Sequence, residues 1–282
     1  MDEGFLTVRE HRHDGAGLRY VYPVVSRRAG GLSIGINLNV NQACNWACVY
    51  CQVQNLRRGG PPPVDLDGLE RELDFFVEQV VSGDYLQRRV AEDCRRLADV
   101  AFSGEGEPTS AAEFGAVVER VGGVLARHGL RGRLPVRLIT NGSLTHRPAV
   151  QAGLAALAAM GGEAWFKLDR ADAAGRWQTN RTRQGMERAF ANLAHCAARV
   201  PTWIQTCWFA RRGHAPDEAA RRAYLDFIRR AKTLILGIHL YGLARVSQQA
   251  GAGELAQLPQ MELVAWGERI ETETGVRVCV SP

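Results

Sequence analysis

The chain has 282 residues, of which 46% are hydrophobic and 23% charged, and its formal net charge is +5. This composition is typical of a globular protein in solution, and the length suits one large α/β domain with a full hydrophobic core. No apolar run is long enough to cross a bilayer, and the charged first residues lack the apolar stretch of a signal peptide. These features predict a cytoplasmic protein that does not enter a membrane.

The distribution of the arginines and of the cysteines along the chain bears on which ligands the protein binds. The positive excess comes from arginine pairs, such as Arg57–Arg58 and Arg211–Arg212, and no basic stripe interleaved with aromatic residues accompanies them. Nucleic-acid binding is therefore not favoured, and an anionic substrate is equally compatible with the charge. The seven cysteines are odd in number, and three of them fall within eight residues. That distribution indicates one metal site in a reducing compartment rather than a disulfide framework.

Short apolar runs alternate with longer amphipathic segments along the chain. The first expected strand covers 32–40, and after a cysteine-rich loop a helix begins near Asp65 or Asp67 and runs to about Gly83. The further units are strand 100–104 with helix 111–128, strand 136–140 with helix 149–160, strand 164–169 with helix 185–200, strand 203–209 with helix 217–232, and strand 234–243 with helix 258–274. A terminal run, 276–280, adds an edge strand.

Repeated strand–helix units imply parallel strands joined by right-handed crossovers. Six units fall short of the eight in a closed TIM barrel. The expected fold is therefore α/β, a partial (β/α)6 TIM barrel over residues 32–282, with an N-terminal extension over residues 1–31. The loops after the strand C-termini carry the chemistry in such barrels, and the unusual residues of this chain lie there.

The loop after the first expected strand contains Cys44, Cys48 and Cys51 in a C-x3-C-x2-C spacing. Soft thiolates this close together select an iron–sulfur cluster or zinc. A structural zinc ion needs four ligands, commonly in two C-x2-C halves, and no second half follows in this sequence. Three thiolates on a four-iron cluster would leave one iron without a protein ligand, and that iron can bind a substrate.

This C-x3-C-x-aromatic-C motif after a first strand resembles the signature of the radical S-adenosylmethionine (radical SAM) superfamily, and the resemblance extends from about Leu32 to Ser281. In that superfamily three cysteines hold a 4Fe–4S cluster, and the open iron chelates the amino and carboxylate groups of S-adenosylmethionine (SAM). The resemblance implies that Cys44, Cys48 and Cys51 are the metal ligands and the catalytic centre, and that Tyr50 lies near the adenine.

Residues 103–109, SGEGEPT, follow the second expected strand and by themselves read as a loop that starts a helix. They resemble the GGEP motif of the superfamily, although Glu105 stands where that motif has its first glycine. The motif binds the methionine amino group through its backbone and its acid. The resemblance therefore implies SAM contacts from a continuous segment, Gly104, Glu105, Gly106 and Glu107.

The ends of the third and fourth expected strands supply the other candidate contacts. Thr140 and Asn141 begin a T-N-G segment that is a plain turn by its residues, but lies beside the cofactor in the related families. Lys167 and Asp169 share one face of a strand by period-two spacing. They either pair with each other in the barrel wall or, as the resemblance suggests, contact the ribose hydroxyls and the methionine carboxylate.

Several further features leave alternatives open. Asn37, Asn39 and Asn41 alternate in the first expected strand, so they line either a polar chamber or a hydrogen-bonded barrel interior. Cys207 is a candidate hydrogen-atom donor, and the remaining cysteines are expected to be small core residues. The segments GIHLYGLAR (237–245) and TGVRVCV (274–280) resemble a compact single-domain subgroup of radical SAM proteins with a GEGEPT loop, largely without assigned substrates.

The resemblance implies a reaction and its partners. A one-electron reductant of the flavodoxin or ferredoxin type reduces the cluster, SAM is cleaved to methionine and a 5′-deoxyadenosyl radical, and that radical abstracts hydrogen from a substrate. The substrate is a small molecule or is delivered by a partner. Alternative activities are tRNA-base modification and activation of a glycyl-radical enzyme. A different class, a non-catalytic iron–sulfur protein, is disfavoured because electron carriers usually saturate their irons with protein ligands.

Overall fold

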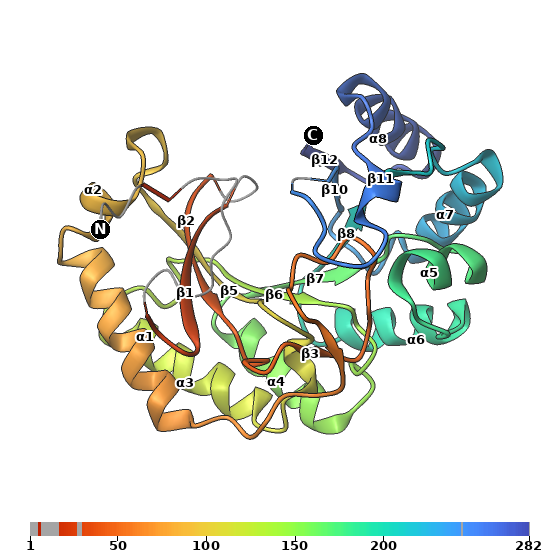
Figure 1. Cartoon of the computed structure of the whole chain (residues 1–282). Helices are drawn as coiled ribbons and strands as arrows, with labels where there is room; N and C mark the ends of the chain where they lie inside the picture. Colours follow the sequence, from red (N-terminus) through yellow and green to blue (C-terminus); the bar gives the residue numbers. More distant parts are fainter. Residues whose placement is uncertain (1–4, 7–16, 27–29, 244, 282) are drawn as a thin grey trace.

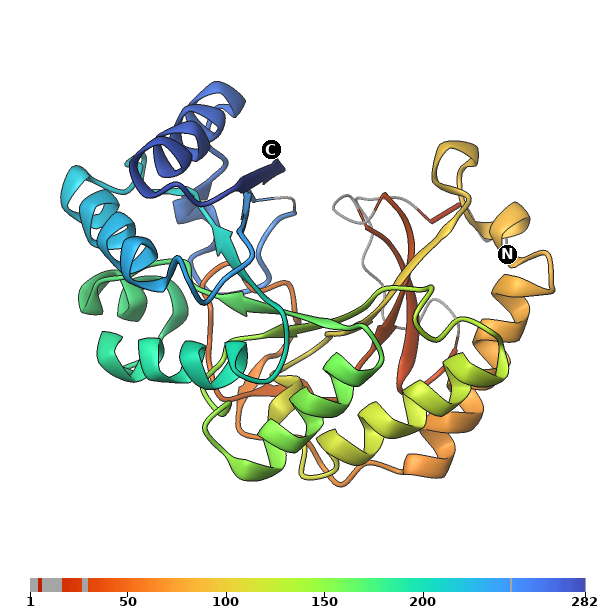
Figure 2. The ribbon, with the colours of Figure 1, turned by 180° about the vertical axis from the view of Figure 1, so that it is seen from behind.

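The central feature of the molecule is an eight-stranded sheet with the strand order β1-β2-β5-β6-β7-β8-β10-β12. The computed structural model describes residues 5–6, 17–26, 30–243 and 245–281. The sheet curls into a half-barrel that is open on one side, and the long helices cover its outer face (Figure 1). Seen from behind, α3 and α4 lie across that outer face, below the sheet (Figure 2). The predicted α/β partial barrel is confirmed.

The elements have the following bounds. The strands of the large sheet are β1 (Val21–Ser26), β2 (Gly31–Ile36), β5 (Leu97–Phe102), β6 (Val136–Thr140), β7 (Glu163–Lys167), β8 (Thr202–Cys207), β10 (Ile238–Tyr241) and β12 (Val278–Ser281). The helices are α1 (Leu66–Val81), α2 (Tyr85–Arg89), α3 (Phe114–Arg127), α4 (Pro148–Ala159), α5 (Ala173–Asn180), α6 (Met186–Ala197), α7 (Glu218–Ala231) and α8 (Gln260–Thr274). Short strands β3 (Ala43–Cys44) and β4 (Arg57–Arg58) pair with each other, as do β9 (Ala210–Arg211) and β11 (Leu255–Ala256), and three 3-10 turns are η1 (Glu92–Cys94), η2 (Pro108–Ser110) and η3 (Ala252–Glu254).

The six predicted barrel strands, β2, β5, β6, β7, β8 and β10, run parallel to one another, and β12 adds the predicted edge strand, also parallel. Strand β1 pairs antiparallel with β2, with Val21 opposite Ile36. It falls within residues 1–31, where the sequence predicted an extension, so this part of the extension belongs to the sheet. No helix within the described ranges is both long and apolar enough to cross a membrane.

Alternation along the strands separates the core from the barrel interior. In β5, Val100 and Phe102 pack into the apolar core beneath the helices, whereas Asp99 and Ala101 line an interior cavity. An aspartate side chain caps the start of α1, α5 and α7: Asp65, for example, accepts a hydrogen bond of 2.9 Å from Gly68 N at the start of α1. The polar strand faces are therefore the ones that surround the open side of the half-barrel.

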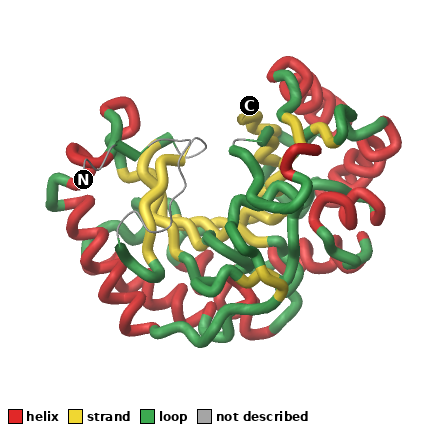
Figure 3. The backbone as a smooth tube through the Cα atoms, in the orientation of Figure 1, coloured by secondary structure: helices red, strands yellow, loops and turns green. Residues whose placement is uncertain are grey.

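Two strand bounds differ from the prediction by four residues, and the other bounds differ by fewer. Strand β2 ends at Ile36 rather than at residue 40, because Asn37 Oδ1 accepts from Asn39 N at 3.1 Å and starts a turn. The predicted amide-lined strand face of Asn37, Asn39 and Asn41 is therefore wrong, since these residues lie in the loop after the strand. Strand β10 begins at Ile238 instead of residue 234. Figure 3 shows in green the long loops that leave the strands, including the one that contains β3.

Candidate functional site

The candidate site is a cavity of about 330 Å³ at the carboxyl-terminal ends of the central strands. Three predicted cysteines line it together with seven of the nine predicted cofactor contacts, namely Tyr50, Gly104, Glu105, Gly106, Glu107, Asn141 and Lys167. Thr140 and Asp169 do not line it, but they bond to lining residues from behind. The structure thus brings together residues that are spread over more than 120 positions of the sequence.

The loop that contains the three cysteines is held by two distant segments. On one side, Ala47 N and Val49 N donate to the carbonyls of Asn180 and Thr179, at the end of α5. On the other side, Ser247 Oγ donates to Val49 O at 2.7 Å. Gln249 Nε2 donates to Val53 O, also at 2.7 Å. Sequence reasoning found neither segment, although Asp172 caps α5 with the same Asp-x-x-Gly spacing that starts α1.

The three cysteine thiols form no disulfide and are half-buried, and their pKa values lie above the ordinary value. Burial raises the pKa of Cys44 to about 12 and that of Cys48 to about 11, and it raises the pKa of Cys51 as well. The positive charge of Lys167 opposes the shift at Cys48 and Cys51. Asn180 Nδ2 also donates to Cys48 Sγ at 3.3 Å. A metal centre must displace these protons, and the cation and the amide favour the resulting thiolates.

The donor set fits a polynuclear iron centre. No three His, Cys, Asp or Glu side chains in the described part of the chain converge on a point that could hold a single metal ion. A four-iron cluster binds each thiolate on a different iron, so its ligands do not have to meet at one point. Cys44, Cys48 and Cys51 surround the same cavity, and three thiols from one loop match the ligand chemistry of such a cluster.

Tyr50 connects the two charged residues at the end of β7. Lys167 Nζ donates to Tyr50 Oη at 2.7 Å, and Tyr50 Oη donates to Asp169 Oδ2 at 2.5 Å. Burial alone would lower the pKa of Lys167, but Tyr241 and Asp169 outweigh it and raise that pKa above its ordinary value. The ammonium group therefore remains charged at the cavity wall. Lys167 and Asp169 interact through Tyr50 rather than as the directly bonded pair that the barrel-wall interpretation predicted.

Asp169 positions the residues around it. Its Oδ1 accepts from Cys207 N at 2.8 Å, and its Oδ2 accepts from Asn180 Nδ2 at 2.6 Å in addition to Tyr50. The side chain is buried and has no place in the cavity lining. Asp169 therefore fixes Tyr50 and Asn180, and Asn180 in turn bonds to Cys48.

Glu107 ties two loops together. Its Oε1 accepts from Thr109 N at 3.1 Å, from Thr109 Oγ1 at 2.6 Å and from Thr140 Oγ1 at 2.6 Å, while its Oε2 accepts from Asn141 N at 2.6 Å. Burial raises the pKa of Glu107, and these four donors oppose the shift. The carboxylate thus joins the loop after β5 to the end of β6, and most of its hydrogen-bonding capacity is used within the protein.

The carboxylate of the neighbouring Glu105 accepts fewer hydrogen bonds from the protein than that of Glu107. It is half-buried, lines the cavity and accepts from Asn37 Nδ2 at 3.2 Å, and burial raises its pKa. The glycines beside it serve close packing inside the protein. A Cβ on Gly104, whose φ is +134°, would lie 2.6 Å from Asn37 Oδ1, and one on Gly106 would lie 2.3 Å from Ala43 O. Both glycines therefore let the SGEGEPT loop approach the segment that begins the cysteine loop.

Asn141 continues this packing toward the cysteine loop. Its Nδ2 donates to Asn45 Oδ1 at 2.7 Å, and Asn45 Nδ2 donates to Ser143 Oγ at 2.7 Å. Asn45 immediately follows Cys44, so the T-N-G turn after β6 holds the first cysteine in place.

The cavity continues past the predicted residues along the inner face of the sheet. Asp99 and Arg137 form an ion pair there, and Arg137 Nε also donates to Glu163 Oε1 at 3.0 Å. Asp99 Oδ1 is buried and has no hydrogen-bond partner among the described residues. Sequence reasoning missed this group, although alternation in LADVAF places Asp99 on the interior face. Cys207 also lines the cavity, and burial raises its pKa, so its thiol is protonated.

Comparison with solved structures returns radical SAM enzymes. A structure of TYW1 with a lysine–pyruvate adduct bound superimposes with a TM-score of 0.59 at 15% identity, over 88% of this chain and 75% of that chain. A radical SAM methyltransferase from Sphaerobacter thermophilus gives a TM-score of 0.59 at 14% identity, over 93% and 68%. The structure of anSMEcpe with bound AdoMet gives 0.53 at 15% identity, over 88% and 61%. At these identities the likeness concerns the fold.

Comparisons of sequence add little to this. No family model matches the chain. GTPase Obg from Brachyspira hyodysenteriae is 26% identical over 135 residues, which are 47% of this chain and 17% of the GTPase. The lysines of this chain, Lys167 and Lys232, do not follow glycine, so the G-K-[ST] core of a phosphate-binding P-loop is lacking. The fold is thus the open partial barrel of the radical SAM enzymes, with three cysteines at its carboxyl-terminal edge.

Proposed function

We propose that this chain is a radical SAM enzyme in which Cys44, Cys48 and Cys51 hold a 4Fe–4S cluster. The observation that carries the proposal is that these thiols and the loops after β5, β6 and β7 line one cavity of about 330 Å³. The cavity lies at the strand ends, where barrel enzymes carry their active sites. When bound there, the cluster and SAM would supply a 5′-deoxyadenosyl radical that abstracts hydrogen from a substrate.

The side chains around the cavity support roles in holding SAM. Lys167 presents an ammonium group to the cavity and is suited to a carboxylate, while Tyr50 offers an aromatic ring and a fixed hydroxyl. Glu105 is the acid with free acceptor capacity at the cavity wall, so we assign it the contact with the methionine ammonium. Glu107 is then a positioning residue, because four internal donors already bond to its carboxylate.

The far end of the cavity indicates the kind of substrate. Asp99 and Glu163 share the one guanidinium of Arg137, which leaves an excess negative charge beside an unpartnered buried oxygen. Such an oxygen is costly unless a donor reaches it. A substrate that carries an ammonium or hydroxyl group near one end would satisfy Asp99 Oδ1 while its other end lies toward the cysteines.

The deciding experiment is anaerobic reconstitution of the chain with iron and sulfide, followed by incubation with SAM and dithionite. Release of 5′-deoxyadenosine, measured by mass spectrometry, is expected, with about four irons per chain. Replacing all three of Cys44, Cys48 and Cys51 by alanine abolishes both. The matched control replaces three cysteines outside the cavity lining, Cys94, Cys196 and Cys279, and leaves both intact.

A second arm separates the enzyme from a non-catalytic iron–sulfur protein. Cys207 lines the same cavity, and as a fourth ligand it would close the cluster against SAM. Cys207→Ala is expected to keep the full iron content. Loss of iron in this variant, together with no release of 5′-deoxyadenosine from the unaltered protein, would mean a closed electron-transfer site.

A further inference from the structure

The outer side of the cysteine loop carries arginines that the proposed chemistry of the cavity does not use. Arg57 and Arg58 form β4 and are exposed. Arg181 and Arg183 follow α5, with their guanidinium carbons 5.7 and 5.1 Å from the ring centroid of Trp177. Arg58 joins the two pairs, because its guanidinium donates to Arg181 O. We call these four arginines and Trp177 the basic face.

The basic face has an excess of positive charge. The two segments that supply it, 42–63 and 173–185, contain no Asp or Glu. None of its four arginines has an ion-pair partner among the described residues. The adjacent Arg211 and Arg212 share the single carboxylate of Glu254 and so add to the excess. A cluster of this kind attracts an acidic partner.

The face lies directly behind the proposed metal site. Arg58 is opposite Cys44 in the β3–β4 register, and its Nη1 donates to Asn45 O at 2.7 Å. None of the residues of the basic face lines the cavity. The cysteine loop therefore has two sides, one facing the cavity and the other covered by arginine.

We infer that the basic face is the docking site of a small acidic one-electron carrier protein. The inference rests on the proposed function, which requires one electron from outside for each SAM cleaved. A protein cannot enter a cavity of about 330 Å³, so its electron has to cross the cysteine loop from the outer side. The carrier is oxidised by one electron and the cluster is reduced by one, and no bond is made or broken between the two proteins.

A nucleic acid is the other polyanion that such a face attracts, and the contacts favour it less. A base that is to be modified has to reach the cavity, which the basic face does not line. Trp177 is 41% exposed, but two arginines of this chain already lie over its ring, which leaves it poorly available for stacking on bases.

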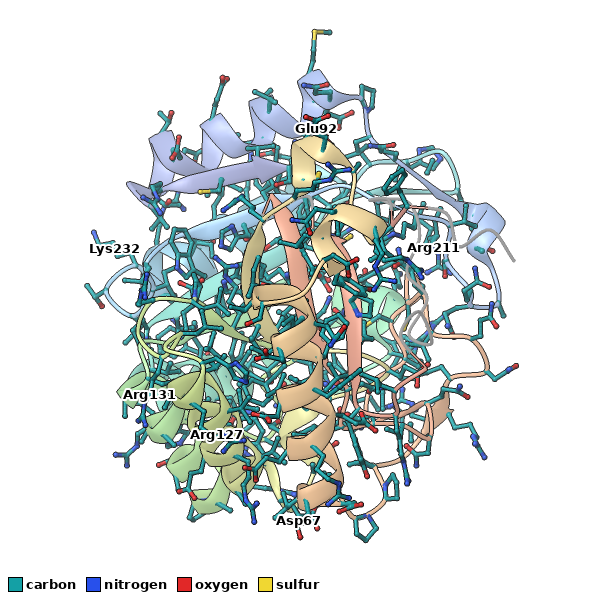
Figure 4. The ribbon with its side chains drawn as sticks, turned by 90° about the vertical axis from the view of Figure 1, so that its left-hand side faces the viewer. Asp67, Glu92, Arg127, Arg131, Arg211 and Lys232 are labelled. Carbon is teal, nitrogen blue, oxygen red and sulfur yellow. The ribbon has the colours of Figure 1, made fainter. Side chains whose placement is uncertain are left out.

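The test compares R181E/R183E with R131E/R133E in the reconstituted protein. Each variant reverses two arginines two positions apart, and Arg131 and Arg133 are exposed without an ion-pair partner among the described residues. Figure 4 shows Arg131 on one side of α1 and Arg211, beside the basic face, on the other. A reduced acidic flavodoxin and dithionite each drive SAM cleavage, and calorimetry measures the binding of the flavodoxin.

R181E/R183E is expected to lower both flavodoxin affinity and the flavodoxin-driven rate at least ~10-fold at low ionic strength, with a smaller loss at high salt. Its dithionite-driven rate stays unchanged, and R131E/R133E matches the unaltered protein throughout. Unchanged flavodoxin binding in R181E/R183E, or equal losses in both variants, would overturn the docking site. Loss of bulk tRNA binding with intact flavodoxin-driven cleavage would assign the face to RNA instead.

The proposed function fails separately. If dithionite releases no 5′-deoxyadenosine from the unaltered protein, the enzyme proposal is wrong. The calorimetric comparison of the two variants still decides whether the basic face binds the carrier.

Discussion

The hydroxyl of Tyr50 donates a hydrogen bond of 2.5 Å to the carboxylate of Asp169. Because Lys167 donates to the same hydroxyl from the cavity side, the tyrosine separates a charge that faces the cavity from one buried behind it. Under the proposed function Lys167 would bind SAM, while Asp169 orients Tyr50 from behind.

This arrangement gives a prediction for substitutions at the end of β7. Lys167→Met and Asp169→Asn should each reduce release of 5′-deoxyadenosine roughly ten- to a hundredfold, since a charged hydrogen bond is worth ~1.5–3 kcal/mol. The double variant should fold, as judged by urea denaturation, and remain inactive. If the two residues only paired in the barrel wall, the double variant would regain most of its stability and its activity. Near-native cleavage by a well-folded double variant would therefore exclude Lys167 as a SAM contact and Asp169 as the residue that positions Tyr50 for it.

The two acids of the SGEGEPT loop should respond differently to replacement by glutamine: one change should affect SAM binding and the other should affect stability. Glu105→Gln is expected to weaken SAM binding to the reconstituted protein roughly ten- to a hundredfold, with iron content unchanged, because it removes a charged acceptor at the cavity wall. Glu107→Gln is expected to cost ~1–3 kcal/mol in unfolding free energy instead, because an amide nitrogen cannot accept from Asn141 N. Calorimetry and urea denaturation on both variants check this. The reverse pattern would make Glu107 the ligand.

The buried carboxyl of Glu107 also predicts a pH dependence. Its pKa in the folded protein is raised above the ordinary 4.5, so between these two values the folded state binds more protons than the unfolded state. The unfolding free energy of the metal-free chain should therefore rise as the pH falls from neutrality through the raised pKa. Denaturation curves of the unaltered protein and Glu107→Gln, measured at several pH values, isolate this contribution. A difference between the two that does not vary with pH would contradict the buried, ionised carboxylate.

Gly106 predicts a link between loop packing and the metal site. A methyl group at this position would lie 2.3 Å from Ala43 O, in the strand that holds Cys44. Gly106→Ala should cost ~1–3 kcal/mol of stability and lower the iron bound after reconstitution. Gly60→Ala is the matched control, because a methyl group there meets nothing within 4 Å and the change should stay within ~0.5 kcal/mol. Equal iron content in the two variants would show that the packing of the SGEGEPT loop does not affect iron binding.

The fold was predictable because its signals are local. Each barrel strand is a short apolar run followed by an amphipathic helix, and this alternation is visible without any long-range information. Strand β1 gave no such signal, since Pro23 interrupts its apolar run and its pairing depends on contact with β2. Helix α5 was missed because its eight residues, AAGRWQTN, have no apolar stripe.

In the candidate site, too, the features with a local sequence pattern were predictable and the long-range contacts were not. The spacing of Cys44, Cys48 and Cys51 predicted a shared position, and all three line one cavity. The bond from Asn180 to Cys48 joins residues 132 positions apart, and no local pattern records it. The basic face could not be predicted from the sequence either, because its arginines come from two distant segments and form one surface only after folding.

The clamps on the cysteine loop have a consequence for synthesis of the protein. The cysteine loop emerges from the ribosome before Ser247, which bonds to Val49 from a position 198 residues further along the chain. At roughly 5–20 residues per second, about 10–40 seconds pass before both clamps exist. During that interval the thiols belong to an unsupported segment that is open to oxidation and to stray metals. If the chain holds the proposed cluster, we expect the cluster to be inserted after the complete chain has folded.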